Sequence, residues 1–440
     1  MLTRRMRILM LSWEYPPLTV GGPGRHVHAL ATALAAGGHE VTVVTRHTPG
    51  APHEEYDEGV HIVRAAEDPA HFPAEDGNLV AWTTAFNHTL TRAALRVARS
   101  GQYDVVHAHG WLVAHAAVTL REHLDVPMIA TVHATEAGRH QGTLPLPHHH
   151  TIDDIEHWLV SEAARVIVCS DFMRREVQHQ FAVPPARTVV IRNGVDVLRW
   201  YARPPEIAAA RRRYAGDAPL ITFAGRLVPE KGVQHLLDAV PRLAEAVPGL
   251  RVVIAGDGPE RAGLEARAPE GVTFAGHLPG PELTALMAAS DCHVVPGEYE
   301  PSGMVALEAT AAGTPVVAAA TGGLTEIVEE GVSGVTFAPG DPEALAAAVV
   351  SVLTDREHSR ALARGGRRRA REDFAWPALA ARTAGVYHQA VRGSGIVARE
   401  AERLLALEAE AAGAEAPVEE TPAGRPSLRL LTSGDDRNVA

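Results

Sequence analysis

Two glutamates on one short segment have the spacing expected of a site for a phosphorylated sugar. Pro301 is favourable at the first position of a helix, and the alanine-rich run after it is predicted to continue that helix to Gly313. Glu300 would then lie at the start of the helix and Glu308 two turns further on. The first N–H groups of a helix lack partners within it and attract anions. The donors predicted to face a phosphate are those of Ser302, Gly303, Met304 and Val305.

The two carboxylates are expected to have different roles. Glu300 is placed to reach hydroxyls of the sugar, and Glu308 to accept hydrogen bonds from both ribose hydroxyls. The alternative is a solvated glutamate at the helix start and a second glutamate on an exposed face. The flanking sequence favours a site, because apolar runs at 294–296 and 315–320 predict buried strands on either side of the helix.

A pair of cations supplies a matching diphosphate site. Arg226 and Lys231 lie in a Pro-containing loop between an apolar run and a helical pattern, where they could neutralise a leaving diphosphate without a metal ion. Lys231 is the only lysine in the chain, and its compact ammonium suits phosphate. The alternative is an exposed ion pair between Lys231 and Glu230.

The first half of the chain contributes a glycine segment and a histidine. An apolar run over residues 6–11 is followed by Gly21, Gly22 and Gly24 and then by a helical pattern, an order typical of phosphate-binding loops. His133 follows a predicted strand over 128–132, at the end where parallel sheets bind ligands, although a buried structural histidine is the alternative. The run 148–150 consists of three adjacent histidines, which cannot converge on one ion, so a surface loop and no metal site are predicted.

The elements that must position these residues alternate between strands and helices, which predicts the α/β class with parallel, doubly wound sheets. The alternation occurs twice. It predicts a Rossmann-like domain over 1–202, completed by a returning helix at 376–392, and a second over 203–375. An Asn-Gly turn at 193–194 is predicted to require a positive φ. The 393–440 tail is predicted to be partly helical and largely disordered.

Composition narrows the classes of function. The net charge of −12 argues against nucleic acid as a partner. No apolar run reaches the roughly 18 residues of a membrane span, and no signal peptide is evident, so a cytoplasmic protein is predicted. Cys169 and Cys292 lie in apolar runs and are predicted to be buried and unpaired. Weak membrane association and the oligomeric state stay open.

Three motifs together resemble those of a known family. They are Glu300-x7-Glu308, the run Gly313-Thr314-Pro315-Val316-Val317 and the run Thr321-Gly322-Gly323. The sequence resembles the retaining glycosyltransferases that include bacterial glycogen synthases, sucrose synthases and phosphatidylinositol mannosyltransferases. The resemblance implies two facing Rossmann-like domains with a deep cleft, the GT-B architecture, and a nucleoside-diphosphate sugar as donor. It implies no cofactor.

The resemblance also implies roles for individual residues. The catalytic set would be Glu300, His133, Arg226 and Lys231, with the first two contacting the sugar and the two cations contacting the diphosphate. Gly22 would approach the diphosphate, and the backbone at Leu278 would contact the base.

Within the family, the runs 13–17 and 131–136 look most like those of actinobacterial α-glucan and glycogen-type glucosyltransferases. The predicted reaction is hexosyl transfer, with glucose as the sugar, to a glycan acceptor such as an α-1,4-glucan. The alternative is a mannosyl or other hexosyl transfer to a lipid or small-molecule acceptor. A glucan phosphorylase would need pyridoxal phosphate on a lysine, and Lys231 lies in the wrong motif for it. A non-catalytic sugar-nucleotide sensor would have lost Glu300 or His133.

Overall fold

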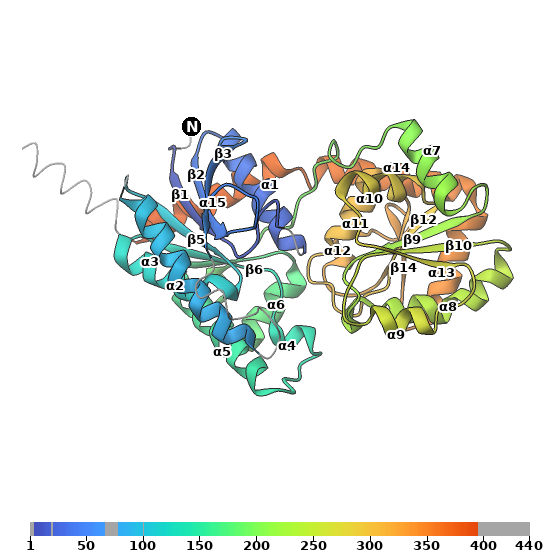
Figure 1. Cartoon of the computed structure of the whole chain (residues 1–440), viewed down its shortest axis with the longest axis horizontal. Coiled ribbons are helices and arrows are strands. Elements are labelled where there is room, and N and C mark those ends of the chain that lie inside the picture. The colour runs from blue at the N-terminus through green and yellow to red at the C-terminus, as the bar shows by residue number, and fades with distance from the viewer. Residues whose placement is uncertain (1–3, 19–20, 67–77, 100, 395–440) are drawn as a thin grey trace, which may run out of the picture. The chain divides into compact units, whose positions relative to one another are not determined.

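The chain folds into two parallel sheets flanked by helices, as predicted (Figure 1). The computed structural model describes residues 4–18, 21–66, 78–99 and 101–394. Apart from its first two residues, the 393–440 segment predicted to form the tail lies outside these ranges. Among the described residues, no helix is both long and apolar enough to cross a membrane.

The first sheet has eight strands in the order β3-β4-β2-β1-β5-β6-β7-β8, of which only β3 is antiparallel to its neighbour. Its strands are β1 (Arg7–Leu11), β2 (Glu40–Arg46), β3 (Glu54–Asp57), β4 (Val60–Ala65), β5 (Val105–His109), β6 (Met128–Val132), β7 (Arg165–Val168) and β8 (Thr188–Val190). The helices between them are α1 (Gly22–Ala36), α2 (Leu79–Ala98), α3 (Ala114–Leu124), α4 (Glu136–Arg139), α5 (Pro147–Glu162) and α6 (Asp171–Gln180). The strand order reverses between β1 and β5, which marks the crevice where such sheets bind ligands.

The second sheet has six parallel strands in the order β11-β10-β9-β12-β13-β14, with its reversal between β9 and β12. Its strands are β9 (Leu220–Ala224), β10 (Arg251–Ala255), β11 (Val272–Gly276), β12 (Cys292–Val295), β13 (Val316–Ala319) and β14 (Gly334–Phe337). The helices are α7 (Pro204–Tyr214), α8 (Val233–Ala246), α9 (Arg261–Ala266), α10 (Gly280–Ala289), α11 (Met304–Ala312), α12 (Leu324–Ile327), α13 (Pro342–Thr354) and α14 (Arg356–Glu372).

Both faces of the second sheet are buried, which explains why its strands are continuous apolar runs. Val252 and Ile254 of β10 belong to the core formed with α8 and α13, whereas Val253 and Ala255 belong to the core on the opposite face. Side chains alternate between the faces of a strand, so a strand covered on both sides needs apolar residues at every position. Cys292 is fully buried in the first of these cores, as predicted.

The last helix, α15 (Trp376–Gly393), packs onto the first sheet rather than the second (Figure 1). Trp376, Leu379 and Tyr387 share one core with Met10 of β1 and Val27 of α1. The hydroxyl of Tyr387 also lies 2.7 Å from Nδ1 of the buried His107. The chain therefore returns to the first sheet after completing the second, and the domain limits at 202 and 375 stay predictions.

Three local predictions are wrong. The helix expected from Pro301 begins at Met304, because Gly303 before it adopts the left-handed conformation, with φ of 57°. The histidines at 148–150 lie in the first turn of α5, since Pro147 begins that helix, and not in a loop. Gly194 has no positive φ and lies in no turn. A Cβ there would lie 2.7 Å from the Trp376 ring, so a glycine is needed for close packing.

Candidate active site

The candidate residues lie at the carboxyl ends of strands next to the two points of reversal. His133 directly follows β6, Arg226 follows β9, and Glu300 follows β12. The sulfur of buried Cys169, just beyond β7, lies 3.3 Å from the carbonyl oxygen of Pro301 and 4.0 Å from that of His133. The His133 and Glu300 segments, predicted independently, therefore converge on one place.

Lys231 and Glu300 form a close ion pair, with 2.7 Å between Nζ and Oε1. The Glu300 side chain is 7% exposed and that of Lys231 is 22% exposed, so the pair is largely shielded from water. Gly232 allows the loop that carries Lys231 to pack closely against the segment between β12 and Glu300. Its φ is 69°, and a Cβ there would lie 2.1 Å from the carbonyl oxygen of Pro296.

Arg226 is the more accessible of the two cations. Its side chain is 49% exposed, and its guanidinium lies 3.4 Å from the Glu230 carboxylate. The alternative pairing of Lys231 with Glu230 is thus wrong: Arg226 contacts Glu230, and Lys231 contacts Glu300. One cation is paired with the glutamate expected to hold the sugar, and the other is half exposed and paired with Glu230.

Glu308 is buried and has a partner that the sequence did not reveal. Arg25 of α1 lies 3.0 Å from its Oε1. Burial raises the pKa of the Glu308 carboxyl, and the Arg25 guanidinium opposes that rise. Arg25 stands one residue after Gly24, so its place in the glycine segment was the only available signal.

Gly22 and Gly24 of the glycine segment belong to a helix, because α1 begins at Gly22, and Gly21 immediately precedes it. A Cβ on Gly22 would lie 2.9 Å from the sulfur of Met304, the first residue of α11. Gly22 and Met304, which were predicted separately to bind the donor, are thus neighbours. A side chain at position 22 would have to displace the methionine.

The start of α11 lies three residues later than predicted. Gly303 packs against α12, where a Cβ would lie 2.9 Å from the Leu324 and Ile327 side chains. Since the helix begins at Met304 with Gly303 as its N-cap, the N–H groups of Gly303, Met304 and Val305 have no acceptor within the helix, and the anion contacts expected at residues 302–305 stay predictions. Leu278, two residues after β11, is buried in a core, and its backbone contact to the base stays a prediction.

His133 belongs to a cluster of neutral histidines. Its Nε2 lies 3.3 Å from Nδ1 of His109, and its ring packs edge-on against that of His26, 4.9 Å away. Burial lowers the pKa of His133 well below its usual range, and His26, His107 and Arg139 lower it further. Burial likewise lowers the pKa of His26 to about 4. At neutral pH His133 can therefore donate or accept a hydrogen bond as an uncharged imidazole.

Tyr299 is a neighbour of Glu300 that sequence reasoning missed. Its hydroxyl donates to Glu176, at 2.8 Å, and accepts from the N–H of Thr135, at 3.1 Å. A Cβ on Gly138 would lie 2.3 Å from that hydroxyl. Tyr299, the residue before Glu300, thus contacts the segment that follows His133.

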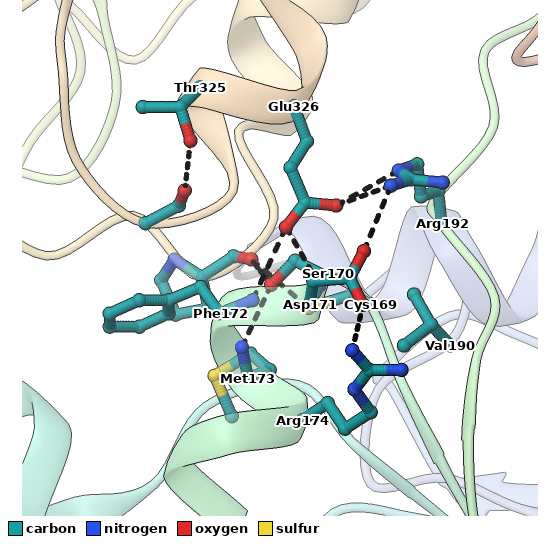
Figure 2. A network of polar contacts seen from close by, with 12 residues as sticks. Cys169, Ser170, Asp171, Phe172, Met173, Arg174, Val190, Arg192, Thr325 and Glu326 are labelled. Carbon is teal, nitrogen blue, oxygen red and sulfur yellow. Dashed lines mark hydrogen bonds and ion pairs between the residues drawn. The ribbon is translucent and has the colours of Figure 1, made fainter.

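A second link joins α12 to the start of α6 (Figure 2). One carboxylate oxygen of Glu326 accepts from the N–H groups of Asp171 and Phe172, at 2.7 and 3.2 Å. The other accepts from Arg192, at 2.7 and 3.0 Å. A carboxylate at a helix N-terminus is favourable because it faces the positive end of the helix dipole. Ser170 extends the link by donating to the carbonyl of Pro301, at 2.8 Å.

Comparisons with known proteins show the family to which the chain belongs. The family described as glycosyl transferases group 1 matches residues 207–369, and that described as Glycosyltransferase Family 4 matches 20–199. A glycogen synthase of Mycobacterium tuberculosis is 46% identical over 88% of this chain and 96% of its own length. An alpha-maltose-1-phosphate synthase of Mycolicibacterium smegmatis is 31% identical over 87% of this chain and 99% of its own length. The structure of sucrose-phosphate synthase from Thermosynechococcus elongatus superposes with a TM-score of 0.75. The two sequences are 26% identical, and the match covers 88% of this chain and 99% of that structure.

The two sheets and the matched family models are those of a two-domain glycosyltransferase of the GT-B type, and hence of an enzyme. The chain belongs to the glycosyltransferase family that includes the mycobacterial glycogen synthase.

Proposed function

We propose that the protein transfers glucose from a nucleoside-diphosphate glucose to the end of an α-1,4-glucan, with retention of configuration and without a metal ion or other cofactor. One observation carries the choice of sugar and acceptor: the 46% identity to a glycogen synthase extends over 96% of that relative. The cytoplasmic location stays a prediction from the sequence.

The proposed chemistry needs only the donor, the acceptor and the side chains described. The acceptor hydroxyl attacks the anomeric carbon on the face from which the diphosphate leaves, and the leaving phosphate takes the hydroxyl proton. Negative charge grows on the diphosphate as the C–O bond breaks. Lys231, Arg226 and the N–H groups at the start of α11 would stabilise this charge, because preorganised donors act most strongly where charge develops.

Glu300 and His133 would contact the transferred sugar. Glu300 holds Lys231 at 2.7 Å, so one carboxylate can orient both the sugar hydroxyls and the cation beside the diphosphate. His133, neutral because burial lowers its pKa, can hydrogen-bond to the sugar without opposing the positive charge that develops on it. Glu308 would accept from the ribose hydroxyls once Arg25 moves aside.

A panel of donors and acceptors tests the proposal. Purified protein is incubated with the glucose and mannose derivatives of UDP, ADP and GDP, each with glycogen, maltooligosaccharides, α-glucose 1-phosphate or inositol 3-phosphate. We expect turnover with a glucose donor and a glucan, and an α-linkage in the product by NMR. A β-linkage would overturn retention.

The small phosphorylated acceptors form a second candidate class, because the mycolicibacterial relative is named for the synthesis of α-maltose 1-phosphate. Transfer to α-glucose 1-phosphate alone, with glycogen inert, would replace the proposed acceptor but leave the donor chemistry unchanged. A mannose donor as the best substrate would overturn the choice of sugar.

A further inference from the structure

A group of three ligand-type side chains lies beside the helices that follow His133. Glu136 is the first residue of α4, His140 immediately follows that helix, and His149 lies in the first turn of α5. Glu136 and His149 are 6% and 8% exposed, while the side chain of His140 is 33% exposed. One side of the group is thus open to solvent and the other is buried.

The three side chains converge on one point. Oε1 of Glu136 lies 3.3 Å from Nε2 of His140 and 3.8 Å from Nε2 of His149. Each of the three side chains offers a ligand atom within 4.8 Å of those of the other two. Two ligand atoms bound at about 2.1 Å in a tetrahedral site are roughly 3.4 Å apart. Small side-chain rotations would therefore bring the three atoms to coordinating distance of one ion.

Neighbouring groups hold the carboxylate in this orientation. Arg139 binds the other oxygen of Glu136, at 3.2 Å, and so leaves Oε1 to the imidazoles. The backbone N–H of Glu136 donates to Glu156, at 2.9 Å. The rings of His140 and His149 stack 4.1 Å apart, with their planes 26° from parallel. Such outer contacts fix the orientation of ligands in metal sites.

We propose that Glu136, His140 and His149 bind one Zn²⁺ ion. Imidazole nitrogen with a single carboxylate favours zinc and its neighbours in the transition series over calcium and magnesium, which prefer oxygen alone. Three protein ligands leave a fourth position for water, and the partly exposed His140 provides a route for entry.

The ion would tie α4 to α5 rather than take part in sugar transfer. The residue before α4, Thr135, donates its N–H to Tyr299, the neighbour of Glu300. A zinc ion would therefore hold the segment that Tyr299 contacts. The sequence could not suggest this site, because only one histidine of the 148–150 run takes part, and its partners lie 9 and 13 residues earlier.

Metal titration of the full chain without a histidine tag tests the proposal. Protein stripped with chelator is titrated with Zn²⁺ by calorimetry, and with Co²⁺ while its visible absorption is recorded. We expect one Zn²⁺ per chain and the intense Co²⁺ bands of a four-coordinate site. His140→Ala should weaken Zn²⁺ binding by at least about tenfold. The exposed His150→Ala, also in the first turn of α5, should have no effect.

Thermal unfolding provides a readout independent of activity. Saturating Zn²⁺ should raise the unfolding midpoint of the wild type and of His150→Ala by at least about 2 °C, because a ligand that binds only the folded state stabilises it. The rise in His140→Ala should be smaller at the same Zn²⁺ concentration, because stabilisation by a ligand falls as its dissociation constant rises. An equal rise in His140→Ala, or Zn²⁺ affinity unchanged by that substitution, would place the ion elsewhere, such as at His26, His109 and His133, and would overturn the proposal.

Discussion

Individual side chains in the candidate site are already held in place by oppositely charged partners. Lys231 is fixed by Glu300, and Glu308 by Arg25. A cation held in place before the donor arrives needs little reorganisation when charge develops on the leaving group. The same pairing means that a donor has to insert between groups that already bind each other.

Lys231→Ala tests the cation. We expect kcat/KM to fall by about 10²–10³-fold, the loss typical of one electrostatic donor to a transition state, with the fold retained. Arg242→Ala is the matched control, because Arg242 lies on the helix after Lys231 and forms an exposed ion pair with Glu343. It should change the rate by less than about twofold. Activity of Lys231→Ala within about threefold of wild type would refute the assignment.

The two glutamates should separate donor binding from turnover. Glu300→Gln keeps the shape but removes the charge beside the sugar, so kcat should fall by roughly 10²–10⁴-fold with little change in nucleotide Kd. Glu308→Gln should weaken nucleotide binding and affect kcat less. Nucleotide Kd and kcat are measured for both variants. The opposite pattern would mean that the donor lies in the reverse direction along α11.

Site residues could be predicted where the neighbouring sequence indicates their position. His133, Arg226 and Glu300 stand at strand ends, and alternating apolar runs predict strand ends well. Arg25, Tyr299 and Arg192 were missed because their partners are distant in sequence; Arg25 and Glu308, for example, are 283 residues apart. Such pairings follow from the packing of whole elements.

At the scale of elements, the strands and the end of α11 at Gly313 were predicted better than the start of α11. Strands such as β10 are buried on both faces, so their apolar composition identifies them. The start of α11 was wrong because Pro301 suits a helix start, but tertiary packing of Gly303 against Leu324 and Ile327 imposes a left-handed residue two positions later.

Alanine substitution should change the stability of the protein in opposite directions at two glycines. Gly194 packs against α15, and Gly385 lies within it. Gly194→Ala would bring a Cβ within 2.9 Å of the Trp376 ring and of Leu379, so we expect destabilisation by about 1–3 kcal/mol. Gly385 lies within α15 with nothing within 4 Å of its Cβ position, so Gly385→Ala should stabilise by about 0.5–1 kcal/mol. Denaturant unfolding measures both. Shifts of the same sign would contradict the close packing at Gly194.

Across the whole molecule, buried neutral histidines predict sensitivity to acid. Burial lowers the pKa of His293 to about 3, whereas an unfolded histidine titrates near 6.5. Between these values the unfolded chain binds a proton that the folded chain does not. Stability associated with His293 is therefore complete above about pH 6.5 and is lost as pH falls toward 3, by at most about 1.4 kcal/mol per pH unit.

The unfolding midpoint at pH 7.5 and 5.5 tests this dependence. His293→Gln should lose less stability on acidification than the wild type does, each protein being compared with its own value at pH 7.5. His277→Gln, at an exposed position, serves as the control and should follow the wild type. An identical decrease in His293→Gln and the wild type would contradict the lowered pKa.

Removal of metal ions should lower the stability of the protein but not its rate of sugar transfer. If Lys231 and Arg226 supply the positive charge at the diphosphate, as proposed, excess chelator should leave the initial rate at 25 °C within about threefold of that of the untreated enzyme. Its unfolding midpoint should fall if zinc is removed from Glu136, His140 and His149. An absolute need for Mg²⁺ or Mn²⁺ in transfer would contradict the first expectation.

The return of α15 to the first sheet has a consequence for synthesis on the ribosome. The first sheet ends at Val190, but the core beside β1 and α1 is covered by a helix that begins only at Trp376. At about 5–20 residues per second, translation of the intervening chain takes on the order of 10–40 s. During that interval the apolar surface that later receives Leu379 and Tyr387 stays uncovered, so the first half of the nascent chain completes its core after the second half has been made.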